Sequence, residues 1–285
     1  MMPVLLLLLA QTAPLTSRLS AIADGSGGRV GVYASILETR ATAMLNENER
    51  FPMQSVYKLP ICMAVLDLVD RRVLSLDTPV RIAASDLAPA GVHSPLRDDN
   101  PHGGTFTIAE LIHAAIAESD GTASDALLHA AGGPEKTTAY VRALGIADMR
   151  IAATEAEMSR DPMVQYSNFS TPRAAVALLA ALQTSPGVPA RTRAILLTEM
   201  RNSTPGPKRL KGLLPSGTIV AHKTGTDATR NGLTRATNDI GIITLPRGRH
   251  LAIAVFVKDS TADQTTREDT IARIARSVFD AWGRK

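Results

Sequence analysis

The sequence predicts an α+β fold in which an antiparallel sheet, flanked by helices and built from both chain ends, receives an inserted all-helical domain. Two observations support this. Segments rich in β-forming residues occur near the two ends of the 285-residue chain, and segments with helical periodicity fill the middle. We therefore expect a sheet domain from residues 14–50 and 206–285, a mainly helical domain from 51–205, and an active site in the cleft between them.

The N-terminal segment begins with a short apolar run from Val4 to Ala10. It is too short to span a bilayer but has the length of a signal-peptide core, so residues 1–13 are expected to be a signal peptide. The segment SRLSAIADG then predicts a short helix that ends at glycine. Two alternating segments, GRVGVYASILE and ATAMLNE, predict paired strands.

Residues 55–71 predict a helix that is apolar on all sides, which is typical of a buried helix. Pro60 fits best in the first turn, which places Ser55 at the N-terminus of this helix. Cys62 lies inside it, and we interpret this single cysteine as a small apolar core residue. With only one cysteine, no intrachain disulfide can form.

Helical segments then alternate with loops up to about residue 202, and strand character returns in the last third of the chain. The predicted helices are TIAELIHAAIAES, TASDALLHAAG, PEKTTAYVRALG, TPRAAVALLAAL and VPARTRAILLTEMRN. The predicted strands are GTIVAHKTGT, TNDIGIITLP and RHLAIAVFVKD, the last two joined by a tight turn. The end, TREDTIARIARSVFDAWGRK, predicts an amphipathic helix.

Composition argues against several classes of function. The net charge is only +4, charges of both signs are interspersed, and aromatic residues make up 4% of the chain. A nucleic-acid-binding protein would normally show a clustered basic face with stacking aromatics. The six histidines show no metal-ligand spacing, so we expect no metal and no cofactor.

Ser55 and Lys58 are three residues apart and would share one face of the helix. A serine hydroxyl is a weak nucleophile until a base takes its proton, and a lysine whose surroundings favour the neutral amine can be that base. Taken alone, the pair is better explained by a serine helix cap and a solvated lysine.

Two further motifs follow in the chain. Ser119-Asp120 lies between two predicted helices, where a polar connector is the ordinary interpretation. Lys223, Thr224, Gly225 and Thr226 end a predicted strand and could bind a carboxylate, since the glycine allows a ligand to approach the backbone closely.

Together, S-x-x-K, S-D-x and K-T-G in this order form the signature of penicillin-recognising serine enzymes. Over nearly its whole mature length the chain resembles class A serine β-lactamases. Its sequence in the segments TEAEM, MQSVYK and AHKTGT is closest to the PER and VEB branch, whose members hydrolyse an extended spectrum of cephalosporins. The resemblance implies hydrolysis of penicillins and cephalosporins, and thereby antibiotic resistance, by an exported, monomeric enzyme with a small-molecule substrate, no nucleic-acid partner and no membrane span.

The resemblance also implies the roles of the residues. Ser55 is the nucleophile, Lys58 and Glu155 share the proton transfers, and Ser119 passes a proton to the lactam nitrogen. The substrate carboxylate binds to Lys223, Thr224, Gly225 and Thr226, and the backbone N–H groups of Ser55 and Thr226 form the oxyanion hole. Glu157 competes with Glu155, but the spacing to the following STP segment favours Glu155.

Four positions depart from the family pattern. Ala153 and Asn168 stand where most class A enzymes have a paired arginine and aspartate, so we expect Gln165 and Asn168 to hold the loop 153–170 by other hydrogen bonds. Ser159 replaces the asparagine that helps to hold the hydrolytic water, and Gly121 replaces the S-D-N asparagine. His93 lies in a loop that, by resemblance, borders the cleft.

Two alternative functions remain open from the sequence. A D-alanyl-D-alanine carboxypeptidase or another penicillin-binding protein shares the first three motifs, and a penicillin-sensing domain would stay acylated. Neither is expected to carry Glu155, and a sensor would also need a membrane segment.

Overall fold

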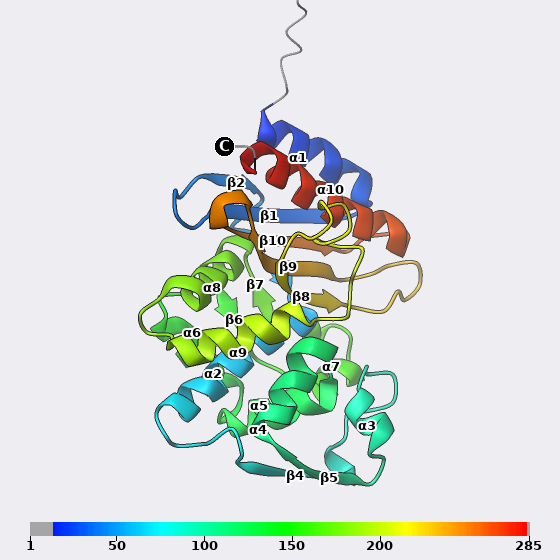
Figure 1. Ribbon diagram of the computed structural model, residues 1–285. Coiled ribbons are helices and arrows are strands. Elements are labelled where there is room, and N and C mark those ends of the chain that lie inside the picture. The colour runs from blue at the N-terminus through cyan, green and yellow to red at the C-terminus, as the bar shows by residue number, and fades with distance from the viewer. Residues whose placement is uncertain (1–13, 284–285) are drawn as a thin grey trace, which may run out of the picture.

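The largest element of the protein is a five-stranded antiparallel sheet with the strand order β2-β1-β10-β9-β8 (Figure 1). The computed structural model describes residues 14–283. The strands are β1 (Arg29–Ile36), β2 (Thr42–Leu45), β8 (Val220–Thr226), β9 (Thr237–Thr244) and β10 (His250–Lys258). Strand β1 pairs directly with β10, with Arg29 opposite Lys258, so the two ends of the chain meet within one sheet. The predicted α+β fold class is confirmed.

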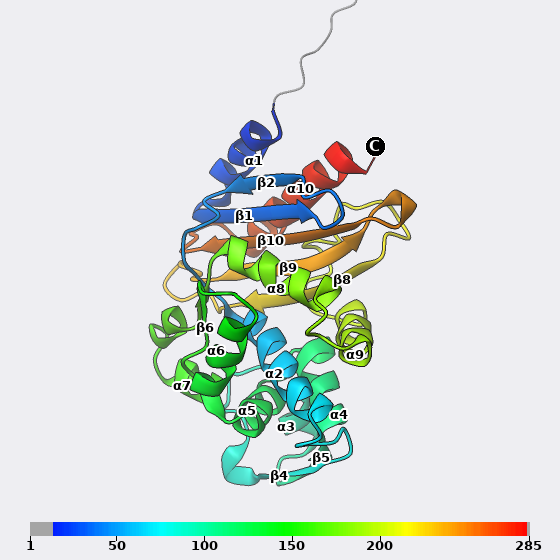
Figure 2. The same cartoon turned by 90° about the vertical axis from the view of Figure 1, so that its left-hand side faces the viewer.

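Helices cover both faces of this sheet (Figure 2). Successive strand side chains point to opposite faces. In β10, Val255 joins the core beneath α1 (Leu15–Ala23) and α10 (Gln264–Trp282), whereas Phe256 joins the core shared with α8 (Pro172–Thr184). Burial on both faces explains why β10 is a nearly continuous apolar run.

The second part of the molecule is built around α2 (Lys58–Asp70), which lies among the other helices below the sheet in Figure 1. Every residue of α2 from Lys58 to Leu66 is buried. The other helices here are α3 (Pro95–Asp99), α4 (Ile108–His113), α5 (Gly121–Ala130), α6 (Gly133–Ala143), α7 (Glu155–Arg160) and α9 (Ala190–Arg201). Helices α5, α6 and α9 pack against α2. The prediction of a helix that is buried on all sides is confirmed. The predicted core position of Cys62 is also confirmed, because Cys62 is fully buried, and this burial raises the pKa of its thiol to about 12.

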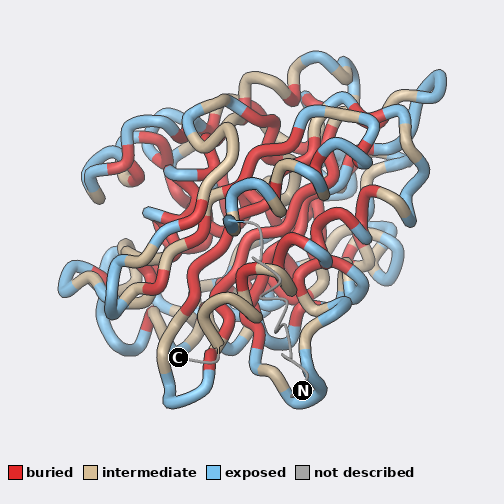
Figure 3. The backbone as a smooth tube through the Cα atoms, turned by 90° about the horizontal axis from the view of Figure 1, so that it is seen from above, coloured by how far each residue is buried: buried red, intermediate tan, exposed pale blue. Residues whose placement is uncertain are grey.

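The buried centre of the molecule is continuous, and exposed backbone is concentrated in the peripheral loops (Figure 3). Helix α8 falls within the expected helical segment 51–205, yet it packs on β1 and β10. The domain boundaries after residues 50 and 205 stay predictions. Within residues 14–283, no helix combines the length and apolarity needed to cross a membrane. The predicted signal peptide, residues 1–13, lies outside the described residues.

Several short elements were not predicted from the sequence. A small sheet has the order β3-β7-β6, from β3 (Phe51–Pro52), β7 (Phe169–Ser170) and β6 (Met149–Arg150), and β4 (Pro79–Ala83) pairs with β5 (Gly103–Thr107). Two-residue strands have no periodicity and form only where tertiary packing brings them together. The predicted helix 55–71 is also split: a 3₁₀ turn, η2 (Gln54–Tyr57), precedes α2, so Ser55 lies in the turn that leads into the helix.

Candidate active site

Ser55 lies in a turn that is held directly against the edge of the large sheet. The side-chain amide of Asn238 on β9 donates to the carbonyl oxygens of Pro52 and Met53, at 2.8 and 3.2 Å. A Cβ atom at Gly225 would come within 2.2 Å of the Met53 oxygen, so only glycine allows β8 this close to the turn. The glycine of the K-T-G motif thus has a packing reason as well as a chemical one.

Four of the predicted side chains converge beside this turn. Lys58 Nζ lies 2.7 Å from the backbone oxygen of Ser119 and 2.9 Å from Glu155 Oε1. Lys223 Nζ donates to Ser119 Oγ at 2.8 Å. Ser119 adopts a left-handed backbone conformation with a φ of 64°, uncommon outside glycine, and this geometry directs its carbonyl and hydroxyl toward two different lysines.

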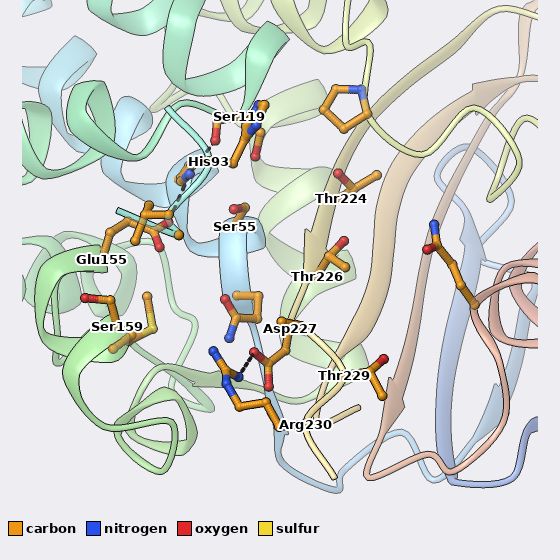
Figure 4. Close-up of a pocket in the computed structure, with 18 of the residues that line it drawn as sticks. Ser55, His93, Ser119, Glu155, Ser159, Thr224, Thr226, Asp227, Thr229 and Arg230 are labelled. Atoms are coloured by element: carbon orange, nitrogen blue, oxygen red, sulfur yellow. Dashed lines mark hydrogen bonds and ion pairs between the residues drawn. The ribbon is translucent and has the colours of Figure 1, made fainter. Parts of the chain in front are cut away.

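A cavity of about 720 Å³ opens over these groups. Figure 4 shows Ser55 between Glu155 on one side and Thr224 and Thr226 on the other. The predicted residues that line the cavity are Ser55, Lys58, Ser119, Glu155, Thr224 and Thr226. The other two predicted residues lie outside this lining: Lys223 donates to Ser119, and Gly225 packs against the turn that carries Ser55. The structure therefore brings all eight predicted site residues together, although their roles stay predictions.

The two lysines of the site are both buried. Burial and the neighbouring charge of Lys58 hold the pKa of Lys223 well below its usual value. A substrate carboxylate placed next to Lys223 would favour its charged form, since an opposite charge stabilises a buried ammonium. The site is thus prepared for an anionic ligand.

Glu155 is fixed at the first turn of α7 by a residue that the sequence analysis missed. The carboxylate of Asp125 on α5 accepts hydrogen bonds from the backbone N–H groups of Glu155 and Ala156, at 2.8 and 3.1 Å. Glu157 instead belongs to a capping box with Thr154, whose N–H donates to Glu157 Oε2 at 2.9 Å. Of the two competing glutamates, Glu155 is therefore the one paired with Lys58.

Asp125 should make the stability of the protein depend on pH. Burial, assisted by the charge of Glu155, raises the pKa of Asp125 to about 6 from 3.8. The folded state then holds this proton more tightly than the unfolded state, so the contribution of Asp125 to the free energy of unfolding falls as pH rises from about 4 to about 6, by up to about 3 kcal/mol.

In Asp125→Asn this contribution should be absent, and the mutant should lose less stability than the wild type between about pH 4 and pH 7. Urea unfolding at several pH values measures the difference. Asp161→Asn is a control for the chemical change, because Asp161 is exposed at the end of α7 and its carboxylate accepts a local bond from the N–H of Met163. Parallel pH curves for wild type and Asp125→Asn would contradict the raised pKa.

Asn168 makes hydrogen bonds between uncharged groups at the place where the family pattern has an arginine–aspartate pair. Its Oδ1 accepts from the N–H groups of Ala152 and Ala153, at 2.7 and 2.9 Å, and its Nδ2 donates to the Ala153 oxygen at 2.8 Å. Gln165 bonds to side chains on two other segments, as described below. The expectation that these two residues hold the loop is confirmed.

Neighbouring atoms fill the space that a side chain at position 121 would need. A Cβ atom there would lie 2.5 Å from Val92 Cγ1, and the Gly121 N–H donates to the His93 oxygen at 2.9 Å. A larger side chain would therefore displace the loop that contains His93, which borders the cavity as predicted. Ser159 also lines the cavity and donates to the Ala156 oxygen at 2.8 Å.

Arg209 is a further buried cation that the sequence analysis did not identify. It donates to Thr226 Oγ1 at 2.8 Å and to the backbone oxygens of Gly225 and Asn238, at 3.3 and 2.9 Å. It also pairs with Glu268 on α10 at 3.2 Å. Its segment has no regular pattern, so no sequence signal pointed to it. Its bonds hold the Lys223–Thr226 end of β8 in place from the side away from the cavity opening, while Glu268 neutralises its charge.

Across residues 14–283, no group of three or more His, Cys, Asp and Glu side chains is arranged to hold a metal ion. The expectation that the reaction needs no metal or cofactor stays a prediction.

Comparisons with known proteins agree over almost the full chain. Residues 14–282 match the model of the beta-lactamase enzyme family. Beta-lactamase VEB-1 of Pseudomonas aeruginosa is 36% identical over 273 residues, covering 95% of this chain and 91% of that protein. Extended-spectrum beta-lactamase PER-1 of the same organism is 36% identical over 270 residues, covering 95% and 88%.

Solved structures show the same similarity. A beta-lactamase from Chitinophaga pinensis superposes with a TM-score of 0.91 and 41% identity, covering 94% of this chain and 98% of that one. The TLA-3 extended-spectrum beta-lactamase gives a TM-score of 0.90 and 40% identity, also over 94% and 98%.

Proposed function

Because the chain belongs to the beta-lactamase enzyme family, we propose that its cleft cleaves β-lactams through an acyl-enzyme on Ser55. The protein is a class A β-lactamase and hydrolyses the β-lactam amide bond, a reaction that confers resistance to these antibiotics. The main support for an acyl-enzyme on Ser55 is the 2.9 Å ion pair of Lys58 and Glu155 in the cavity that contains Ser55.

In acylation, Ser55 Oγ attacks the lactam carbonyl, and its proton passes to Lys58 or Glu155. The ion pair supports a shared role, because the two groups lie together in the cavity that contains Ser55. Backbone N–H groups of Ser55 and Thr226 stabilise the negative charge on the tetrahedral oxygen. The tetrahedral intermediate then collapses and the C–N bond of the lactam breaks.

Ser119 donates its hydroxyl proton to the departing lactam nitrogen. The 2.8 Å contact with Lys223 supports this role, because an ammonium at that place can replace the proton that Ser119 gives up. The substrate carboxylate binds along Lys223, Thr224 and Thr226. Gly225 has no side chain and so allows β8 to approach the turn that carries Ser55. Arg209 positions Thr226 for this binding by donating to its hydroxyl oxygen.

In deacylation, Glu155 takes a proton from a water molecule that attacks the acyl carbonyl, and the bond to Ser55 Oγ breaks as that oxygen receives a proton back from Glu155 or Lys58. This step separates a β-lactamase from the alternatives, a carboxypeptidase or a penicillin sensor, in which no such carboxylate is expected. The separate anchoring of Glu155 by Asp125 supports its assignment to this step. We further propose that the enzyme is exported and acts as a monomer.

We expect oxyimino-cephalosporins to be hydrolysed with a kcat/KM within about tenfold of that for simple penicillins, a barrier difference of about 1.4 kcal/mol or less. Asn168 anchors the loop 153–170 by hydrogen bonds between uncharged groups. This supports the proposal that the loop follows a different path from the usual class A loop and leaves room for a bulky substrate side chain. Steady-state kinetics over a panel of β-lactams tests this. Cephalosporins disfavoured by several orders of magnitude would contradict it.

A further inference from the structure

A chain of hydrogen bonds runs below the cavity and joins three segments that are distant in sequence. Gln54 Nε2 donates to Gln165 Oε1 at 2.7 Å, and Gln165 Nε2 donates to Asp227 Oδ2 at 2.9 Å. Arg230 completes the chain through a 2.7 Å ion pair with Asp227 Oδ1, drawn as a dashed line in Figure 4. We call these four residues, Gln54, Gln165, Asp227 and Arg230, the Gln165 bridge.

The centre of the Gln165 bridge is shielded from water. Gln165 is 1% exposed and Asp227 is 8% exposed. Water therefore competes poorly for these bonds, and removing one partner would leave a buried polar group unsatisfied, at a cost of about 1–3 kcal/mol. The link between Gln165 and Asp227 is thus a firm connection, whereas the ion pair from Asp227 to Arg230, whose side chain is 43% exposed, contributes less.

The bridge connects the nucleophile turn to both side walls of the cavity. Gln54 directly precedes Ser55, with a left-handed φ of 46°. Gln165 lies in the turn η5 (Val164–Ser167), in the loop that also carries the wall residues Met158 and Ser159. Asp227 follows β8 and begins the opposite wall, which runs to Arg230.

The catalytic groups are held by other contacts. Glu155 is anchored by Asp125 and Lys58, and the start of the loop is anchored by Asn168. Breaking the bridge should therefore change the spacing of the walls more than the geometry of the reacting groups.

We propose that Gln165 is a specificity-determining residue, which fixes the width of the slot between the two walls and thereby sets which β-lactam side chains the enzyme accepts. This inference rests on the proposed function. A small side chain needs little contact with the walls, whereas a bulky oxyimino side chain depends on both of them. The bridge should then affect bulky substrates selectively.

Gln165→Glu tests the proposal with almost no change in shape. A carboxylate can accept the bond from Gln54, but it cannot donate to Asp227 or to the Pro162 oxygen, both of which accept from Gln165 Nε2, and it would face Asp227 with a like charge. We expect KM for an oxyimino-cephalosporin to rise at least about tenfold, while kcat/KM for benzylpenicillin stays within about threefold.

The effect should also depend on pH. Two carboxyl groups in contact share a proton as pH falls, which would restore the bond to Asp227. The increase in KM should therefore shrink between about pH 7.5 and pH 5.5, which a purely structural defect would not produce. Asn48→Asp makes the same amide-to-carboxylate change at an exposed residue away from the bridge and should leave both substrates and the pH profile unchanged.

If Gln165→Glu does not fold, as judged by thermal melting, Gln54→Leu breaks the first link alone and should give the same selective increase in KM. Equal losses for both substrates, or no change for either, would overturn the proposal. The wild-type enzyme is assayed first with benzylpenicillin, so failure of the proposed function would be seen there, before any variant is compared.

Discussion

Ser55→Ala should abolish covalent labelling by a fluorescent penicillin and lower kcat/KM by roughly 10⁴-fold or more, the scale seen when a serine nucleophile is removed. Alanine leaves no oxygen to attack the lactam carbonyl, and the turn that carries residue 55 is held by backbone contacts from Asn238. The fold should therefore persist, and gel fluorescence together with thermal melting separates loss of labelling from loss of structure.

Ser159→Ala is the matched control, since Ser159 lines the same cavity and its hydroxyl bonds only locally to Ala156 among the described contacts. This variant should still be labelled. Labelling of Ser55→Ala at another serine would show that the nucleophile has been assigned wrongly.

Glu155→Gln should acylate and then stay acylated. The amide keeps the shape of the side chain but cannot take a proton from water, so deacylation should slow by roughly 10²–10⁴-fold, the usual contribution of a general base. Lys58 remains available for acylation, although it loses its ion-pair partner. Intact-mass spectrometry after mixing with benzylpenicillin should show an accumulated adduct.

Glu157→Gln separates the two candidate glutamates. Glu157 caps α7 through Thr154, so this variant should lose some stability but still turn over substrate. Adduct accumulation in Glu157→Gln together with normal turnover in Glu155→Gln would reverse the assignment.

The residues that could be predicted from sequence are those in short motifs whose spacing has a chemical meaning. Ser55 and Lys58 form such a motif, and Lys223 to Thr226 form another. The long elements were also predictable, because α2 and β10 are long enough to show their periodicity or their burial on all sides.

The residues that were not predicted contact partners that are far away in the sequence. Asp125 meets Glu155 from another helix, and Arg209 reaches β8 from an irregular segment. Gln165 was expected to hold the loop, but its partners Gln54 and Asp227 could not be identified, because the three residues come together only in the folded chain. The split before α2 was missed because it depends on the left-handed backbone of Gln54, which no residue type there requires.

Locating the trapped adduct is the most direct test of the central claim that β-lactams are hydrolysed through an acyl-enzyme on Ser55. Glu155→Gln is mixed with benzylpenicillin, quenched, digested with trypsin and sequenced by tandem mass spectrometry. We predict a single acyl group on Ser55, and none in the same experiment on the double variant Ser55→Ala/Glu155→Gln. An adduct on any other residue, or turnover by Glu155→Gln at the wild-type rate with no adduct, would contradict the account.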